Sequence, residues 1–413
     1  MDKKIIQLTI LDQRSSFEKK DEIIKRYFPK SFIASKKIIA ISGVRRSGKS
    51  TLLKQIAKEY INYYYLNFED ERLLDFTYSD FNNLYEIFLS LHGEQKVFFF
   101  DEIQNIYGWE KFVNRLFNDG YKIFVTGSNA KLLSSELATS LSGRHLKFEM
   151  YPFSFAEFLT CKKFDIKDFY TTKEQAKIIK FFNDYLDLGG FPEVVISRDE
   201  NELKQLYQDI LIKDLIVRFK IKEVKAFREL AIYLLSNISS NISFNNLKNV
   251  LGFNSVTTVK NYIEYLEEAY LHFTVSKFDY SLKKQIINDK KIYGIDTGLI
   301  NHVSFAFSQN IGRILENLVF LELKRRDKTI FYHKDKRECD FLIKQGREIV
   351  EAIQVTESLK QDNQEREIEG LVEAMGKYKL KRGLILTFGK EDELIKANYK
   401  IKILPIWKWC LGN

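Results

Sequence analysis

A glycine-rich loop near the start of the chain has the residue types needed to hold a phosphate. Residues 43–50 read GVRRSGKS and match the pattern GxxxxGK[ST]. The preceding run, 37–42 (KIIAIS), is typical of a buried strand, and the following run, 51–60, is typical of a helix. In that setting main-chain N–H groups surround a β-phosphate, and the helix N-terminus adds partial positive charge. The loop predicts a nucleotide site formed by Gly43, Arg46, Ser47, Gly48, Lys49, Ser50 and Thr51.

Charged and hydroxyl side chains around this loop could supply the chemistry of ATP hydrolysis. Lys49 would reach the β- and γ-phosphates, and the Ser50 hydroxyl would bind Mg²⁺. A second apolar run, 96–100, ends in Asp101 and Glu102. We expect Asp101 to hold the metal and Glu102 to orient and activate the attacking water. ATP and Mg²⁺ are therefore the predicted ligands.

Two further apolar runs end in polar residues. The run 121–125 leads into 126–129 (TGSN), where Ser128 or Asn129 could sense the γ-phosphate, although Gly, Ser and Asn also form ordinary turns. The run 63–66 is another expected strand. Because ligands bind at the carboxyl ends of parallel strands, these segments predict an α/β core with one shared site.

The order of these motifs resembles that of prokaryotic AAA-type P-loop ATPases with a C-terminal domain of unknown function. The similarity covers nearly the whole chain and rests on GVRRSGKS, YLNFED, VFFFDEIQN, VTGSN, LSGR, YPFSFAEF and GGFPEVV. It implies a nucleotide site at Gly43, Gly48, Lys49, Ser50, Thr51, Asp101 and Glu102. It also implies a winged helix and a nuclease-like fold downstream, without a settled biological activity.

Arg144, in the run LSGR, could act on a nucleotide held by a second copy of the chain. A guanidinium can bond the transition-state oxygens of a transferred phosphoryl group. This interpretation makes a homo-oligomer a candidate assembly. The alternative is that Arg144 is an ordinary surface residue.

The middle of the chain contains a candidate helix-turn-helix. Residues 245–251 and 255–270 have helical patterns on either side of a turn at Gly252. Thr257, Lys260 and Asn261 would face outward, so they are candidate DNA contacts. The following segment, 273–296, suits a β-wing whose Lys283, Lys284, Lys290 and Lys291 could meet phosphates. The alternative is a module that only packs beside the nucleotide domain.

The last hundred residues resemble the core of a restriction-endonuclease-like fold. Such a metal site needs a helix Glu, a strand Asp, and an acid and a lysine on the next strand. Glu316 and Asp340 fit the first two places, but Gln354 and Thr356 replace the acid and the lysine. The other register offers Glu351 without a lysine. We therefore expect a degenerate nuclease site that serves as a docking scaffold, with active nuclease as the alternative.

Length and composition fit this division into parts. The 413 residues suggest about three domains, and 45% hydrophobic and 29% charged residues are ordinary globular values. A net charge of +9 permits DNA as a partner, and no protein partner is indicated. No run is apolar enough for a membrane span and the three cysteines form no CxxC pair, so we expect a cytoplasmic protein with reduced thiols.

The predicted architecture is an α/β P-loop NTPase core of AAA type with a parallel sheet, a winged helix-turn-helix and a C-terminal restriction-endonuclease-like α/β domain. Its expected boundaries are 1–160 for the ATPase core, 161–225 for a helical lid, 226–304 for the winged helix and 305–413 for the endonuclease-like domain.

Overall fold

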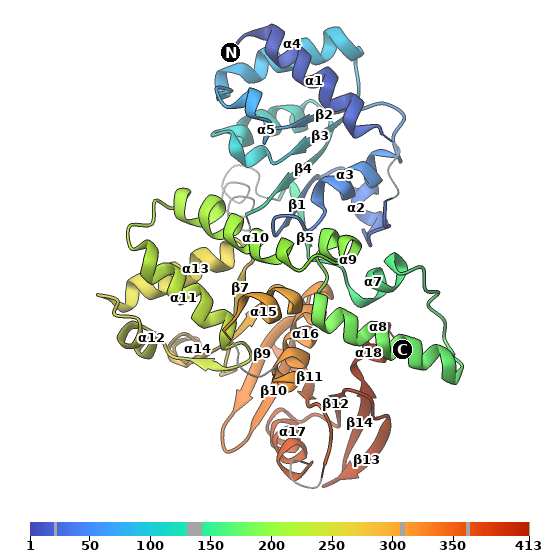
Figure 1. Ribbon diagram of the computed structural model, residues 1–413, viewed down its shortest axis with the longest axis vertical. Coiled ribbons are helices and arrows are strands. Elements are labelled where there is room, and N and C mark those ends of the chain that lie inside the picture. Colours follow the sequence, from blue (N-terminus) through green and yellow to red (C-terminus); the bar gives the residue numbers. More distant parts are fainter. Residues whose placement is uncertain (20–22, 130–142, 306–309, 361–363, 413) are drawn as a thin grey trace. The chain divides into compact units, whose positions relative to one another are not determined.

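The computed structural model describes residues 1–19, 23–129, 143–305, 310–360 and 364–412. The chain divides into two compact units, residues 1–151 and 152–413, which are described separately (Figure 1). Within the described ranges, every helix is too short or too polar to cross a bilayer.

A parallel sheet forms the centre of the first unit. Its strands stand in the order β2-β3-β4-β1-β5, and every neighbouring pair is parallel. They are β1 (Ile38–Gly43), β2 (Tyr64–Asn67), β3 (Val97–Asp101), β4 (Lys122–Gly127) and β5 (His145–Met150). The predicted parallel α/β core is confirmed.

Helices cover both faces of this sheet because its strands are apolar on both sides. Along β3, Phe98 and Phe100 face one hydrophobic cluster and Phe99 faces the other, as the alternation of side chains in a strand requires. The first cluster also contains residues of α1 (Lys3–Phe17), α4 (Phe81–His92) and α5 (Trp109–Asn118). The second contains α3 (Lys49–Ala57), the helix that follows the glycine-rich loop. Shorter elements are α2 (Lys30–Ala34), η1 (Glu71–Leu73), η2 (Tyr78–Asp80) and η3 (Ile103–Asn105).

The second unit begins with a series of helices. They are α7 (Phe155–Cys161), α8 (Thr172–Leu188), α9 (Pro192–Ser197), α10 (Asn201–Asp209), the π-helix η5 (Ile210–Val217) and α11 (Val224–Ser236). The carboxylate of Asp296, a residue just before a later helix, accepts a hydrogen bond from the Gly190 N–H at 2.7 Å. This bond ties the end of α8 to α15 (Thr297–Val303), whose first turn Asp296 also caps.

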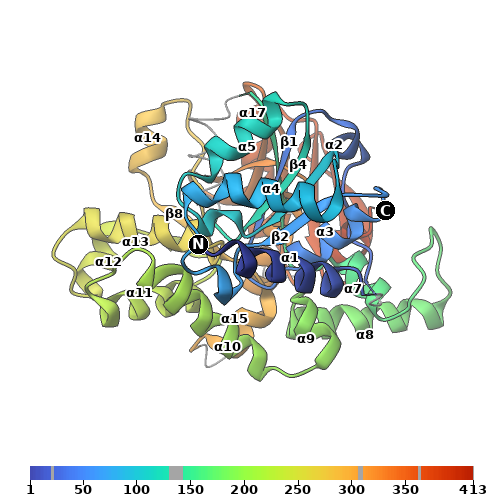
Figure 2. The same cartoon turned by 90° about the horizontal axis from the view of Figure 1, so that it is seen from above.

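A small three-stranded sheet follows with the order β6-β8-β7. Its elements are β6 (Asn241–Ile242), α12 (Phe244–Val250), α13 (Val256–Glu268), β7 (His272–Ser276), α14 (Leu282–Ile287) and β8 (Lys290–Gly294). Helices α11, α12 and α13 gather together in both views (Figure 2), and Ile286 and Ile287 of α14 line one pocket with residues of α12 and α13. The two predicted helices and the predicted hairpin are present, but the hairpin loop contains the unpredicted helix α14.

The chain ends in a mixed six-stranded sheet with the order β13-β14-β12-β11-β10-β9. Its strands are β9 (Thr329–Lys334), β10 (Glu338–Gln345), β11 (Glu348–Val355), β12 (Arg382–Thr387), β13 (Asp392–Lys396) and β14 (Tyr399–Pro405). Leu342 packs toward α17 (Gln364–Tyr378), whereas the adjacent Phe341 contacts Tyr293 of β8. The remaining helices are α16 (Ile311–Arg325) and α18 (Ile406–Cys410), and all three cysteines are free thiols.

Candidate functional site

The glycine-rich loop leaves β1 and turns sharply into α3. Gly48 has a φ of 95° and caps the helix, and Arg46 has a φ of 60°, in the left-handed region where glycine is favoured. Gly43 lies against β5, because a Cβ there would come within 2.1 Å of the Met150 carbonyl oxygen. The sequence therefore needs glycine at 43 for close strand packing and at 48 for the turn.

Lys49 points back across the loop that it terminates. Its Nζ lies 3.2 Å from the carbonyl oxygens of Gly43 and Val44 and 3.2 Å from Glu102 Oε1. The side chain is only 5% exposed. Lys49 and Glu102, which are far apart in the sequence, thus form a buried ion pair at the carboxyl ends of β1 and β3.

Asp101 is a buried carboxylate at the end of β3. The Thr126 hydroxyl of β4 donates to its Oδ1, while Oδ2 is buried with no hydrogen-bond partner among the described residues. Burial, reinforced by the Glu102 charge, raises the pKa of Asp101 to about 6, and the Ser50 and Thr126 hydroxyls offset part of the rise. An unpaired carboxylate oxygen beside a hydroxyl is the donor set that Mg²⁺ prefers, so Asp101 and Ser50 fit the expected metal.

Glu102 is held in place from several directions. Its backbone has a φ of 50°, and its N–H donates to the Thr126 hydroxyl at 2.9 Å. Its Oε2 accepts from Gln104 Nε2 at 2.6 Å and from the Ser128 amide at 3.1 Å. Burial alone would raise the pKa of Glu102, but Lys49 and Gln104 together bring it below its ordinary value. This carboxylate is therefore ionised at neutral pH and able to accept a proton or a water.

Of the two candidate sensor residues, Ser128 contacts Glu102 through its backbone amide, and Asn129 is buried next to it at 2% exposure. The structure thus places Ser128 beside the acid pair, and Asn129 is the next residue along the chain. Arg144 is exposed and just precedes β5, where its Nη1 donates to Asn114 and, at 3.1 Å, to Asn118 of α5. Residues 141 and 142 of the run LSGR lie outside the described residues.

Two residues of the site, Arg26 and Thr126, were not among the residues predicted from the sequence. Arg26 is 7% exposed and donates to the carbonyl oxygens of Ser47, at 2.7 Å, and Tyr151, at 2.6 Å. It fixes the glycine-rich loop to the end of β5. Thr126 joins the two acids, and its place as the first residue of TGSN after a strand was the only hint of that position.

The outward face of α13 carries the candidate DNA contacts. Thr257, Lys260 and Asn261 are all exposed. Of the acids that would repel a phosphate, Glu264 is also exposed on this helix, whereas Glu267 and Glu268 are engaged elsewhere. Glu267 Oε1 accepts from Thr274 N and Oγ1 at 2.7 Å, and Glu268 is buried.

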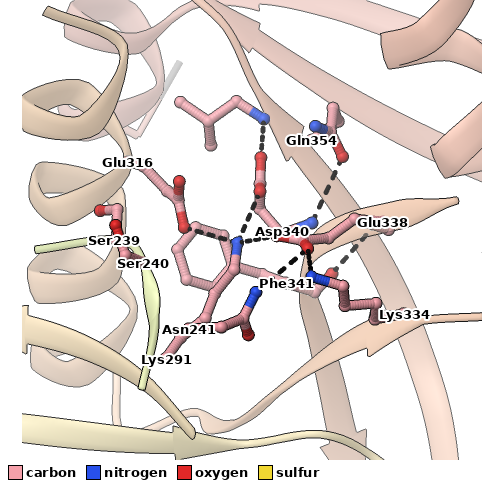
Figure 3. Close-up of polar contacts among 12 residues, drawn as sticks. Ser239, Ser240, Asn241, Lys291, Glu316, Lys334, Glu338, Asp340, Phe341 and Gln354 are labelled. Carbon is pink, nitrogen blue, oxygen red and sulfur yellow. Dashed lines mark hydrogen bonds and ion pairs between the residues drawn. The ribbon is translucent and has the colours of Figure 1, made fainter. Parts of the chain in front are cut away.

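The candidate nuclease residues come together in the second unit (Figure 3). Glu316 of α16, Asp340 of β10 and Gln354 of β11 line one cavity of about 470 Å³. The Gln354 side chain, not Glu351, reaches Asp340, because Gln354 Oε1 accepts from the Asp340 amide at 3.3 Å.

The prediction that Lys291 meets external phosphates is wrong. Lys291 is 1% exposed, and its ammonium binds Glu316 and Asp340, which line the same cavity. Its position on β8 points the side chain toward α16 and β10, whereas Lys283 and Lys284 of α14 are exposed.

Family models match three parts of the chain, and two relatives match most of its length. Residues 35–159 match an AAA domain, and residues 179–310 and 311–409 match two domains of unknown function. An uncharacterized protein of Methanocaldococcus jannaschii is 40% identical over 100% of this chain and 96% of its own length. Another, from Haemophilus influenzae, is 32% identical over 91% of this chain and 94% of its own length.

Two solved structures are more distant. The replication initiator DnaA bound to AMPPCP and single-stranded DNA is 18% identical, with coverage of 58% of this chain and 84% of that chain and a TM-score of 0.26. The Aeropyrum pernix ORC2 protein in its ADP form is 13% identical, with coverage of 63% and 90% and a TM-score of 0.34.

Proposed function

Because the chain belongs to a family of prokaryotic proteins in which an AAA domain precedes two domains of unknown function, we propose that it is a Mg²⁺-dependent ATP hydrolase. Its nucleotide state would drive or gate movement of the parts after residue 151. The observation that carries the proposal is the buried pair of Lys49 and Glu102, 3.2 Å apart, beside the unpaired oxygen of Asp101.

Each of these side chains has a distinct task in the proposed reaction. The loop amides and Lys49 would hold the phosphates, and Asp101 with Ser50 would hold Mg²⁺, which neutralises phosphate charge when bound. A phosphate that attracts Lys49 would weaken its hold on Glu102. The Glu102 carboxylate would then orient a water and accept its proton.

The direct test measures ATP binding by calorimetry and phosphate release for the full chain and three variants. Lys49→Ala should lose tight binding, since the phosphates lose their buried cation. Glu102→Gln should still bind ATP but hydrolyse it about 100-fold more slowly or worse. Lys54→Ala, a lysine on the same helix whose Nζ donates to the Ser16 carbonyl and lies over the Phe17 ring, should behave as wild type. Equal turnover in all four proteins would refute the proposal.

A second candidate is an ATP-gated DNA-binding regulator, in which α12, α13 and the β7–β8 hairpin act as a winged helix. It is favoured by the exposure of Thr257, Lys260 and Asn261 on one face of α13. Filter binding over a salt series should show that Lys260→Glu weakens DNA binding and flattens its salt dependence. Lys225→Glu, on α11 with 91% of its side chain exposed, is the charge-matched control. A lack of DNA affinity at low salt would refute the proposal of a DNA-binding regulator.

For the C-terminal part we propose a degenerate endonuclease-like scaffold that docks nucleic acid or protein. Gln354 supports this, because its amide stands where a carboxylate would be needed to hold a catalytic metal. An ATP-regulated nuclease at Glu316 and Asp340 is the weaker alternative. Plasmid nicking by wild type that is lost in Asp340→Ala would favour that alternative.

A further inference from the structure

A buried lysine binds the acids that line the cavity in the C-terminal part. Lys291 Nζ lies 3.0 Å from Glu316 Oε1, 2.9 Å from Asp340 Oδ1 and 2.7 Å from Glu338 Oε1 (Figure 3). The lysine comes from β8, whereas its three carboxylate partners come from α16 and β10. One ammonium therefore bridges the two acids that an endonuclease-like fold would use to bind a metal.

Other polar atoms of the cluster also have partners within the chain. Asp340 Oδ2 accepts from the Val355 amide at 2.9 Å. Gln354 Oε1 accepts from the Asp340 amide, and its Nε2 donates to Glu367 at 2.7 Å. A Mg²⁺ ion would need several oxygens at about 2.1 Å, and it would repel an ammonium bound to the same carboxylates. The residues present do not fit a divalent metal.

Two lysines offset the carboxylate charge of the cluster without a metal. Lys291 contacts all three carboxylates, and Lys334 Nζ pairs with Glu338 at 3.0 Å, so a second cation supports the rim. Tyr293 also donates to Glu316 Oε1 at 2.7 Å. The carboxylates therefore have charged and polar partners within the chain.

We propose that Lys291 is the resident cation of this cavity, in the place that a divalent metal ion would fill, and that removing its ammonium creates a metal site at Glu316 and Asp340. Because Lys291 belongs to the sheet of β6, β7 and β8, the same contact binds that sheet to the C-terminal part. Glu316 and Asp340 thus form ion pairs that hold two parts of the chain together. The cavity then lacks the metal ion that an endonuclease-like site would need for phosphodiester cleavage.

The test is Mn²⁺ binding by the nucleotide-free full chain, followed by electron paramagnetic resonance. All proteins carry Asp101→Asn, so that the nucleotide site does not contribute. Measurements use about pH 8.5 and about 1 mM Mn²⁺, because carboxylates bind a metal ion in their deprotonated form. We expect no ion bound at this cavity in the parent, close to one per chain in Lys291→Met, and none in Lys291→Met with Asp340→Asn. Lys334→Met, which removes a cation of the same cavity that pairs with Glu338, should bind none.

Two results would overturn the proposal. One is Mn²⁺ binding by the parent that Asp340→Asn abolishes, and the other is a Lys291→Met protein that is folded by circular dichroism yet gains no ion. If Lys291→Met does not fold, the comparison of the parent with its Asp340→Asn variant decides alone. Binding lost in that variant then refutes the proposal, and absence of binding in the parent supports it.

Discussion

Asp101 carries its charge where water does not reach it, since its side chain is 0% exposed. Burial raises its pKa to about 6 from an ordinary value of 3.8. The folded protein therefore binds this proton more tightly than the unfolded chain, and stability falls as the pH rises from about 4 to about 6. Asp101→Asn removes the ionisable group and therefore this loss of stability. In denaturant titrations of the nucleotide-free protein, we expect the substitution to raise the free energy of unfolding by roughly 1–3 kcal/mol at neutral pH. This gain should shrink as the pH falls below about 6.

The neighbouring acid provides an internal control of opposite sign. Because Lys49 and Gln104 outweigh the effect of burial, the pKa of Glu102 is lowered, and its ionised form stabilises the folded state. That stability is present above the ordinary pKa of a glutamate and is lost as the pH falls below it. Glu102→Gln should therefore destabilise the protein at neutral pH. If both substitutions shift stability in the same direction, the charge argument is wrong.

At the scale of single residues, the sequence predicts a site best where the residues of that site lie in one chain segment. The spacing of Gly43, Gly48 and Lys49 encodes a turn, a close approach and a cation, and the structure contains all three. The contacts of Arg26 and Lys291 could not be predicted from such patterns, because their partners lie far away in the sequence. The sequence does not distinguish the lysines of a wing-like segment from one another, because the strand determines which of them points inward.

At the scale of elements, Arg26 joins the glycine-rich loop to the last strand of the sheet. Its two donors reach Ser47 O and Tyr151 O, a forked arrangement that a lysine cannot reproduce. We expect Arg26→Lys to weaken ATP binding about 5- to 20-fold, the cost of about one lost hydrogen bond to a charged group, measured by calorimetry.

Arg14→Lys is the matched control for this substitution. Arg14 also donates to a main-chain carbonyl oxygen, that of Tyr63, but from α1 and not to the loop. It should lower thermal stability without a change in ATP affinity. If the two variants bind ATP equally well, Arg26 does not position the loop.

The elements themselves follow their local patterns closely. Buried runs such as KIIAIS became strands, and the two helical patterns in the middle became α12 and α13. Helix α14 was not predicted, because its short run LKKQII lies between turn residues and has no buried side chain to mark a packed face. The choice between Gln354 and Glu351 depended on the register of β11 with β10, which only strand pairing determines.

At the scale of the whole molecule, the question is whether one chain can complete its own nucleotide site. Arg144 is exposed and bonded to Asn114 and Asn118. These neutral partners do not neutralise its charge, which stays available to a phosphate of a second copy. If Arg144 acts on a neighbour, Lys49→Ala and Arg144→Ala chains should each be inactive alone. Their mixture should regain ATP hydrolysis, because the first supplies the arginine and the second an intact loop.

Two controls make this complementation specific. Adding Glu102→Gln to the Arg144→Ala chain removes the only competent site in the mixture, so activity should disappear again. Arg115→Ala tests another arginine, on α5 itself, whose Nη1 donates to Asn82 Oδ1, and it should hydrolyse ATP as wild type does. A mixture that stays inactive while Arg144→Ala alone is impaired would restrict Arg144 to its bonds with α5. Turnover per chain that rises with protein concentration in wild type, but not in Arg144→Ala, would place the arginine in a neighbouring site.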